Sequence, residues 1–89
     1  MRPLVQKNLS AYNNIMKSEE RKMIAYIVAC IGEFARASGM TAQDAFKYLY
    51  EYGGIDFLIE CYDTEHLLSL YDAVEDLKII TQKSGGMIA

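Results

Sequence analysis

The sequence predicts an all-α protein, a compact bundle of about four helices that follows a polar N-terminal arm. Two observations carry this prediction. Apolar residues recur three and four positions apart through most of the chain, which is the spacing of one helix face. No stretch keeps the period-two alternation of a strand, and no Asn-Gly or Asp-Gly pair marks a hairpin.

The chain has 89 residues and corresponds to one small domain. Hydrophobic residues make up 52% of it and charged residues 24%, a globular rather than a disordered composition. We expect three parts: a loose or partly helical arm over residues 1–17, a helical domain over 18–84 and a C-terminal tail over 85–89. A core this small leaves apolar surface that is hard to cover, so we also expect that the protein can form a homodimer.

The first helix of the domain is predicted to begin at Ser18 and to end at Gly39. Ser18 suits the N-cap position, and Glu19 and Glu20 follow in the first turn, where the helix dipole favours acids. Gly39 suits the left-handed residue that follows many helices. Apolar residues surround most of this helix, so we expect it to be central. Its main stripe is Ile24, Ile27, Ile31 and either Phe34 or Ala35.

The second helix is predicted to begin at Thr41 and to stop at the glycine pair Gly53–Gly54. Asp44 stands three residues after Thr41, in the place of a capping-box acid. Spacing predicts a buried stripe of Ala42, Ala45, Phe46 and Leu49.

A short third helix follows the glycines. Its inward residues are predicted to be Ile55, Leu58, Ile59 and Tyr62. The last helix has two predicted starts. Thr64 can cap it directly, or it can restart at Ser69, which forms a cap-like pair with Asp72 and leaves residues 64–68 as a separate turn. Gly85 and Gly86 are predicted to end it.

Charge is unevenly distributed along the chain, whose net charge is −3. Residues 1–36 carry six basic side chains and three acids, whereas residues 37–89 carry three basic side chains and nine acids. Between Asp44 and Asp76 only Lys47 is basic. Nucleic-acid binding needs clustered cations that replace the counterions of phosphates. The acidic part of the chain therefore favours a basic protein surface as partner and makes nucleic acid an unlikely one.

The sequence contains no signal for export or membrane insertion. Its longest apolar run, "MIAYIVACI", is too short to span a bilayer, and the N-terminus lacks the apolar core of a secretory signal. Cys30 and Cys61 each stand in an apolar run, so we expect buried, reduced thiols. We predict a cytoplasmic protein that makes no membrane contact.

Cys61 and His66 are the candidate pair for nucleophilic catalysis. They are five residues apart, so on a continuous helix they point about 140° apart, and no third group is placed to orient the histidine. In the structural interpretation, His66 is a half-exposed side chain that hydrogen-bonds a neighbour. Two cysteines and one histidine do not supply the four ligands of a zinc site. We predict no catalytic residues, no metal and no cofactor.

Seven tyrosines in so short a chain indicate a protein-binding surface, because tyrosine is enriched at interfaces. Positions two apart on a helix diverge, so Tyr48, Tyr50 and Tyr52 cannot all face one core, and Tyr50 is expected to be exposed. The acids that follow are expected on the outer side of the next helix. The predicted partner-binding residues are Tyr48, Tyr50, Tyr52, Asp56, Glu60, Asp63 and His66.

The stretches "GGIDFLIECYDTEH" and "DAVEDL", within residues 22–82, resemble a family of short bacterial proteins classed as a domain of unknown function, number three-seven-nine-one. The resemblance implies a small helical protein without an established enzymatic activity. It also implies an association with genes for ADP-ribosyltransferase-like toxins. A toxin encoded by the adjacent gene is therefore the implied partner.

Together these observations predict a non-catalytic protein–protein interaction module, an antitoxin or accessory partner of a toxin in the version that the resemblance implies. The alternative is a DNA-binding transcriptional regulator that uses a basic N-terminal arm. The cations of that arm are Arg2, Lys7, Lys17, Arg21 and Lys22. A helix-turn-helix over residues 41–60 is disfavoured because its second helix carries acids and no Lys or Arg.

Overall fold

The computed structural model describes the backbone of residues 2–87 and the side chains of residues 17–87. Five helices make up this part of the chain: α1 (Arg2–Ser38), α2 (Ala42–Glu51), α3 (Gly54–Glu60), α4 (Tyr62–Glu65) and α5 (Leu70–Lys83). The described residues contain no strand, which confirms the predicted all-α class. Residues 88 and 89 of the predicted tail lie outside the described residues, as does Met1 of the predicted arm.

α1 is longer than predicted. It runs from Arg2 to Ser38 without interruption, so the predicted helix start at Ser18 is wrong. Between Pro3 and Gly32 the sequence has neither glycine nor proline, so nothing in it breaks the helix at Ser18. Residues 2–17, predicted as a separate arm, are the N-terminal part of the same helix.

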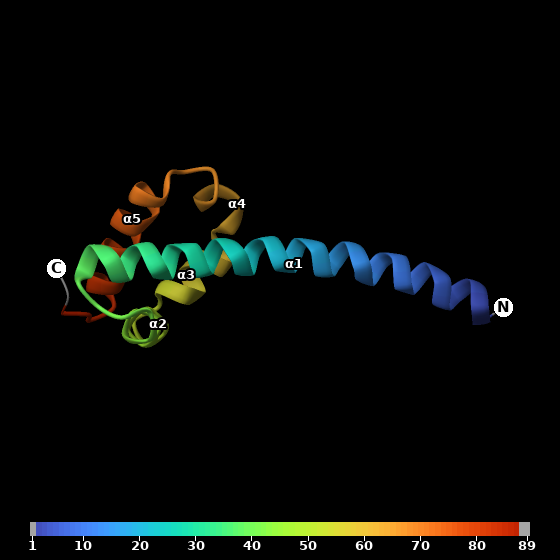
Figure 1. The fold of residues 1–89 in the computed structure, drawn as a ribbon, viewed down its shortest axis with the longest axis horizontal. Coiled ribbons are helices and arrows are strands. Elements are labelled where there is room, and N and C mark those ends of the chain that lie inside the picture. Colours follow the sequence, from blue (N-terminus) through green and yellow to red (C-terminus); the bar gives the residue numbers. More distant parts are fainter. Residues whose placement is uncertain (1, 88–89) are drawn as a thin grey trace.

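The other four helices lie beside the C-terminal half of α1 (Figure 1). α2, α3 and α5 contact α1, and α4 connects α3 to the segment that leads into α5. The molecule measures 58 × 23 × 22 Å, because the N-terminal half of α1 extends away from this packed part. We call the packed part, α2–α5 with the C-terminal half of α1, the body.

α1 and α2 end at the glycines that the sequence predicts. Gly39 has φ +69° after α1, and the Met40 amide donates to the Ala35 carbonyl at 2.9 Å. Beyond this turn α2 is inclined to α1 by 105°. Gly53 has φ +83°, a left-handed conformation that favours glycine. A Cβ at Gly54 would lie 2.8 Å from Leu49 Cδ2, so this position has no room for a side chain.

The predicted threonine and serine N-caps are both present, at the starts of α2 and α5. Thr41 Oγ1 accepts from the Asp44 amide and Ser69 Oγ from the Asp72 amide, each at 3.1 Å. The last helix therefore restarts at Ser69, as the second of the two predictions states. Thr64 is not a cap: it lies inside α4, and its hydroxyl donates to the Cys61 carbonyl at 3.1 Å.

The core lies between α1, α2, α3 and α5. Its buried apolar residues are Cys30, Phe34, Ala35, Ala45, Leu49, Ile55, Leu58, Ala73, Val74 and Leu77. Three residues predicted to face inward, Ile24, Phe46 and Ile59, are exposed instead, and so is Ala42. The body covers only one side of α1, so the apolar residues on its other side stay in contact with solvent.

Candidate functional site

The predicted partner-binding residues fall into separate places. Tyr48 and Tyr52 lie at the edge of the core, both half-buried. The Tyr48 ring stacks on Phe34, with ring centroids 5.8 Å apart, and lies 5.0 Å from the Tyr52 ring. A Cβ at Gly86 would lie 2.2 Å from the Tyr48 hydroxyl oxygen, so Tyr48 also packs against the turn after α5. Tyr48 thus links α2 to α1 and to the turn after α5, and Tyr52 packs beside it.

Tyr50 is on the outer side of α2, as predicted, and is 67% exposed. Its ring stacks on Phe46, with centroids 6.0 Å apart. Phe46 was predicted to be buried but is 46% exposed, so it joins Tyr50 in an exposed aromatic pair. Their spacing of four residues on one helix is the signal that could have identified this pair from the sequence.

Asp56 and Glu60 are exposed on α3, and Asp63 is exposed on α4. The ion pairs among residues 17–87 are Lys22–Glu19, Arg36–Glu33 and Lys78–Glu75. Each of them joins residues three apart on one helix, so none of them neutralises these three acids. The prediction of an acidic outer surface agrees with this arrangement.

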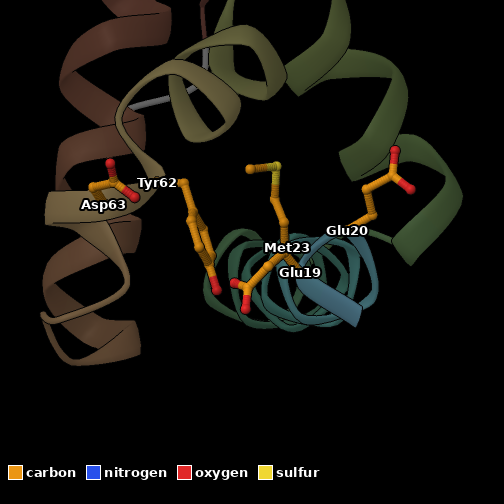
Figure 2. A pocket seen from close by; sticks show the side chains of 5 residues that line it. All are labelled: Glu19, Glu20, Met23, Tyr62 and Asp63. Carbon is orange, nitrogen blue, oxygen red and sulfur yellow. The ribbon is translucent and has the colours of Figure 1, made fainter. Parts of the chain in front are cut away.

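A pocket of about 270 Å³ opens where α1 leaves the body. Figure 2 shows Tyr62 and Met23 facing each other across it, with the Tyr62 hydroxyl directed toward Glu19. Glu20 and Asp63 complete the lining, which therefore consists of three acidic residues, one aromatic residue and one methionine, with no basic residue. This combination suits a basic side chain, whose stem can pack on Met23 while its cation lies near Tyr62 and the carboxylates.

His66 lies beside this pocket as part of an aromatic cluster. Its ring stacks on Tyr62 at a centroid distance of 4.4 Å, and Tyr26 meets both rings edge-on, at 5.5 Å from Tyr62 and 6.4 Å from His66. His66 Nδ1 donates to the Tyr62 carbonyl at 2.6 Å. The histidine is therefore engaged with Tyr62, which fits its structural interpretation.

Glu65 is a site residue that sequence reasoning missed. It is only 7% exposed and, among the described residues, its Oε1 has no hydrogen-bond partner. Burial, together with the neighbouring Asp76 carboxyl on α5, raises the pKa of Glu65 to about 7. Glu65 and Asp76 are eleven residues apart on different helices, so no local spacing signals their contact.

Two residues of α1 face this carboxyl pair. Burial raises the pKa of Tyr26, and its contact with the Cys30 thiol adds to the shift. Burial also raises the pKa of Cys30. A thiol with a raised pKa is a poor nucleophile. Cys30 is fully buried, and Cys61 is half-buried rather than buried as predicted.

Residues 17–87 contain no group of three or more His, Cys, Asp and Glu side chains able to hold a metal ion. No single described helix is long and apolar enough to cross a membrane. Lys17–Ser38 and α2 pass that test only when taken together, across their 105° bend.

Fold and surface together define a small all-helical protein with an acid-lined pocket, an exposed aromatic pair and a buried carboxyl pair. The chain belongs to the DUF3791 family, described as "Protein of unknown function", whose model matches residues 25–83. This result confirms the resemblance stated from the sequence. No curated protein and no solved structure matches the chain.

Proposed function

We propose that the protein is a non-catalytic protein–protein interaction module that binds a basic segment of its partner. The observation that carries this proposal is the pocket formed by Glu19, Glu20, Met23, Tyr62 and Asp63. An arginine suits it well, because a guanidinium can pair with carboxylates and lie against an aromatic ring at the same time.

Further acids support a basic partner beyond the pocket itself. Asp56 and Glu60 on α3 are exposed, and from Asp44 to Asp76 the chain has a single cation. Such an acidic surface speeds the encounter with a basic partner, and the effect weakens as salt increases. The exposed Phe46–Tyr50 pair adds a second contact region on α2.

The finer version of the proposal makes the partner a toxin and this protein its antitoxin or accessory subunit in the cytoplasm. That version depends on the family resemblance, and the pocket supports only the charge of the partner. Coexpression with the product of the adjacent gene, followed by affinity purification, tests it. We expect the two proteins to elute together, and two proteins that never associate at high expression would refute the toxin version.

The pocket is tested with charge reversals at exposed positions. We expect Glu20→Lys and Asp63→Lys each to weaken binding of the partner at least about tenfold, because a basic segment then meets a like charge. Glu51→Lys is the matched control, since Glu51 is exposed on α2 and does not line the pocket. Equal binding by all three variants and the unaltered protein would show that the pocket is not the binding site.

The alternative, a DNA-binding regulator, has weaker support. Lys17, Arg21 and Lys22 are exposed on α1, but Glu19 and Glu20 stand on the same turns and reduce the positive potential there. A gel shift at low salt with the promoter of its own gene tests whether the protein binds DNA. Absence of a shifted band removes this alternative.

A further inference from the structure

α1 extends well beyond the helices that pack on it. Its 37 residues span about 55 Å at 1.5 Å per residue, close to the length of the whole molecule. The side chains of residues 17–22 are all exposed, and half-buried positions start at Met23. An isolated helix is marginal in water, so a long helix usually has a further surface to pack on.

An apolar stripe lies on the side of α1 that faces away from the body. We call it the outer stripe; it consists of Ile24, Ala25, Val28, Ala29 and Gly32. All five are exposed, and Ile24 and Val28 are each 60% exposed although they are four residues apart on one helix face. A Cβ at Gly32 would meet no atom within 4 Å, so the space beside it is open.

The outer stripe is complementary to itself. Ile24 and Gly32 are each four residues from Val28, on opposite sides of it. When two copies of α1 lie antiparallel about a two-fold axis at Val28, Ile24 of each copy is level with Gly32 of the other. The largest side chain of the stripe then meets the position that has no side chain, twice in one symmetric contact. Ala25 and Ala29 let the two helices approach closely.

Charge selects the antiparallel orientation. Residues 1–22 carry five cations and two acids, whereas the C-terminal end of α1 carries the negative pole of the helix dipole and leads into the acidic part of the chain. Antiparallel packing about Val28 places Lys17, Arg21 and Lys22 of each helix level with residues 34–39 of the other, near the negative end of its dipole, and residues 2–16 beyond that end. Parallel packing would place the two basic halves side by side. The ion pairs described above lie within single helices, so none of those found among residues 17–87 joins a cation of α1 to an acid of α2–α5.

We propose that a second copy of the chain covers the outer stripe, with the two α1 helices packed antiparallel about a two-fold axis near Val28. This dimer is separate from the pocket interaction proposed above and does not depend on it. Its existence also explains why Ile24 and Val28 are apolar at positions that the chain itself leaves exposed.

The oligomeric state of the full chain tests the proposal. In sedimentation equilibrium at about 10 and about 100 µM, concentrations that detect a micromolar dissociation constant, we expect a species of twice the 10.1 kDa chain mass. Val28→Glu is expected to raise the dissociation constant at least about 100-fold, since it places two carboxylates at the two-fold axis. Ile79→Glu on α5 is the matched control, as Ile79 is an exposed apolar residue outside the stripe.

Two results would overturn the proposal. A monomer at every concentration would leave the stripe to a different protein, and a dimer that persists in Val28→Glu would have to use another face. Circular dichroism of each variant confirms that the body is folded. Val28 is exposed, so its substitution is not expected to unfold the protein.

Crosslinking tests the orientation. In a Cys61→Ser background, Val28→Cys is treated with a short bis-maleimide that spans the about 8–10 Å between packed helices. We expect a covalent dimer, because the two Val28 positions are adjacent. Lys17→Cys is expected to stay uncrosslinked, because antiparallel packing separates the two copies of residue 17 by about 33 Å. Crosslinking at residue 17 would show parallel packing and refute the antiparallel arrangement.

Discussion

The two sides of α1 differ in burial far more than in composition. On the inner side, Cys30 and Phe34 are fully buried against the body, whereas on the outer side Ile24 and Val28 remain largely exposed. All four residues are apolar and stand at helical spacing within eleven positions. Apolar spacing therefore identifies faces that are able to pack, but it does not say which face the chain covers by itself.

The largest effect is expected on the inner side. Phe34→Ala should lower the free energy of unfolding by about 3–5 kcal/mol, because it removes a fully buried ring that stacks on Tyr48 and leaves a cavity. Urea unfolding followed by circular dichroism measures the loss. A loss below about 1 kcal/mol would mean that the body does not hold this side of α1 tightly. Ile24→Ala, on the outer side, is the matched control.

A smaller effect is expected at the rim of the inner side, where Glu65 lies. Because burial raises its pKa from an ordinary value near 4.5 to about 7, the folded protein holds the proton more tightly than the unfolded chain does. The contribution of this residue to stability is full below the ordinary pKa, falls as the pH rises toward 7 and is constant above it. The loss between pH 5 and pH 8 amounts to up to about 3 kcal/mol.

Glu65→Gln isolates this contribution, since it removes the charge and keeps the size. We expect the unfolding free energy of the variant, relative to the unaltered protein, to increase from pH 5 to pH 8. Glu60→Gln, at an exposed site on α3, should change little over the same range. If the unfolding free energies of Glu65→Gln and the unaltered protein differ by the same amount at pH 5 and pH 8, burial does not raise the pKa of Glu65.

Features that depend on a few neighbouring residues could be predicted from the sequence. The Thr41–Asp44 and Ser69–Asp72 caps and the left-handed Gly39 are examples, because each is decided within four residues. Ser18 also looks like an N-cap, since Glu19 and Glu20 follow it in what would be the first turn of a helix. It is not a cap, because no glycine or proline interrupts residues 4–17 and the helix continues through Ser18.

Features that depend on distant residues could not be predicted. Phe46 and Ile59 have the spacing of core residues, but whether they are buried depends on where other helices lie, and they are exposed. Glu65 reads as a solvated acid in the first turn of a helix, yet it is buried beside Asp76 of another helix. Of the five residues that line the pocket, only Asp63 belongs to the predicted partner-binding residues. That prediction also lacks the exposed Phe46 and the buried Glu65.

Ser69 and Ser18 provide a test that compares the body with the extended half of α1. Ser69→Ala should lower the unfolding free energy by about 1 kcal/mol, because it removes the acceptor for the Asp72 amide at the start of α5. Ser18→Ala should be neutral or slightly stabilising, since alanine is the better helix former inside a helix. Thermal unfolding of both variants measures the difference, and a destabilising Ser18→Ala would argue for a helix start at Ser18.

The smallest effect is expected on the outer side of α1. Its dependence on protein concentration distinguishes a monomer from a dimer. In a monomer, Val28→Ala removes little buried surface and should change the unfolding free energy by less than about 0.5 kcal/mol. If a second copy covers the stripe, association stabilises the folded state by mass action, and Val28→Ala then lowers the melting temperature more as the protein concentration rises. Phe34 is buried within one chain, so the loss of stability caused by Phe34→Ala should not depend on the protein concentration. Melting curves of both variants across a 100-fold concentration range distinguish the monomer from the dimer. If the melting temperatures of Val28→Ala and of the unaltered protein differ by the same amount at every concentration, no second copy covers the outer stripe.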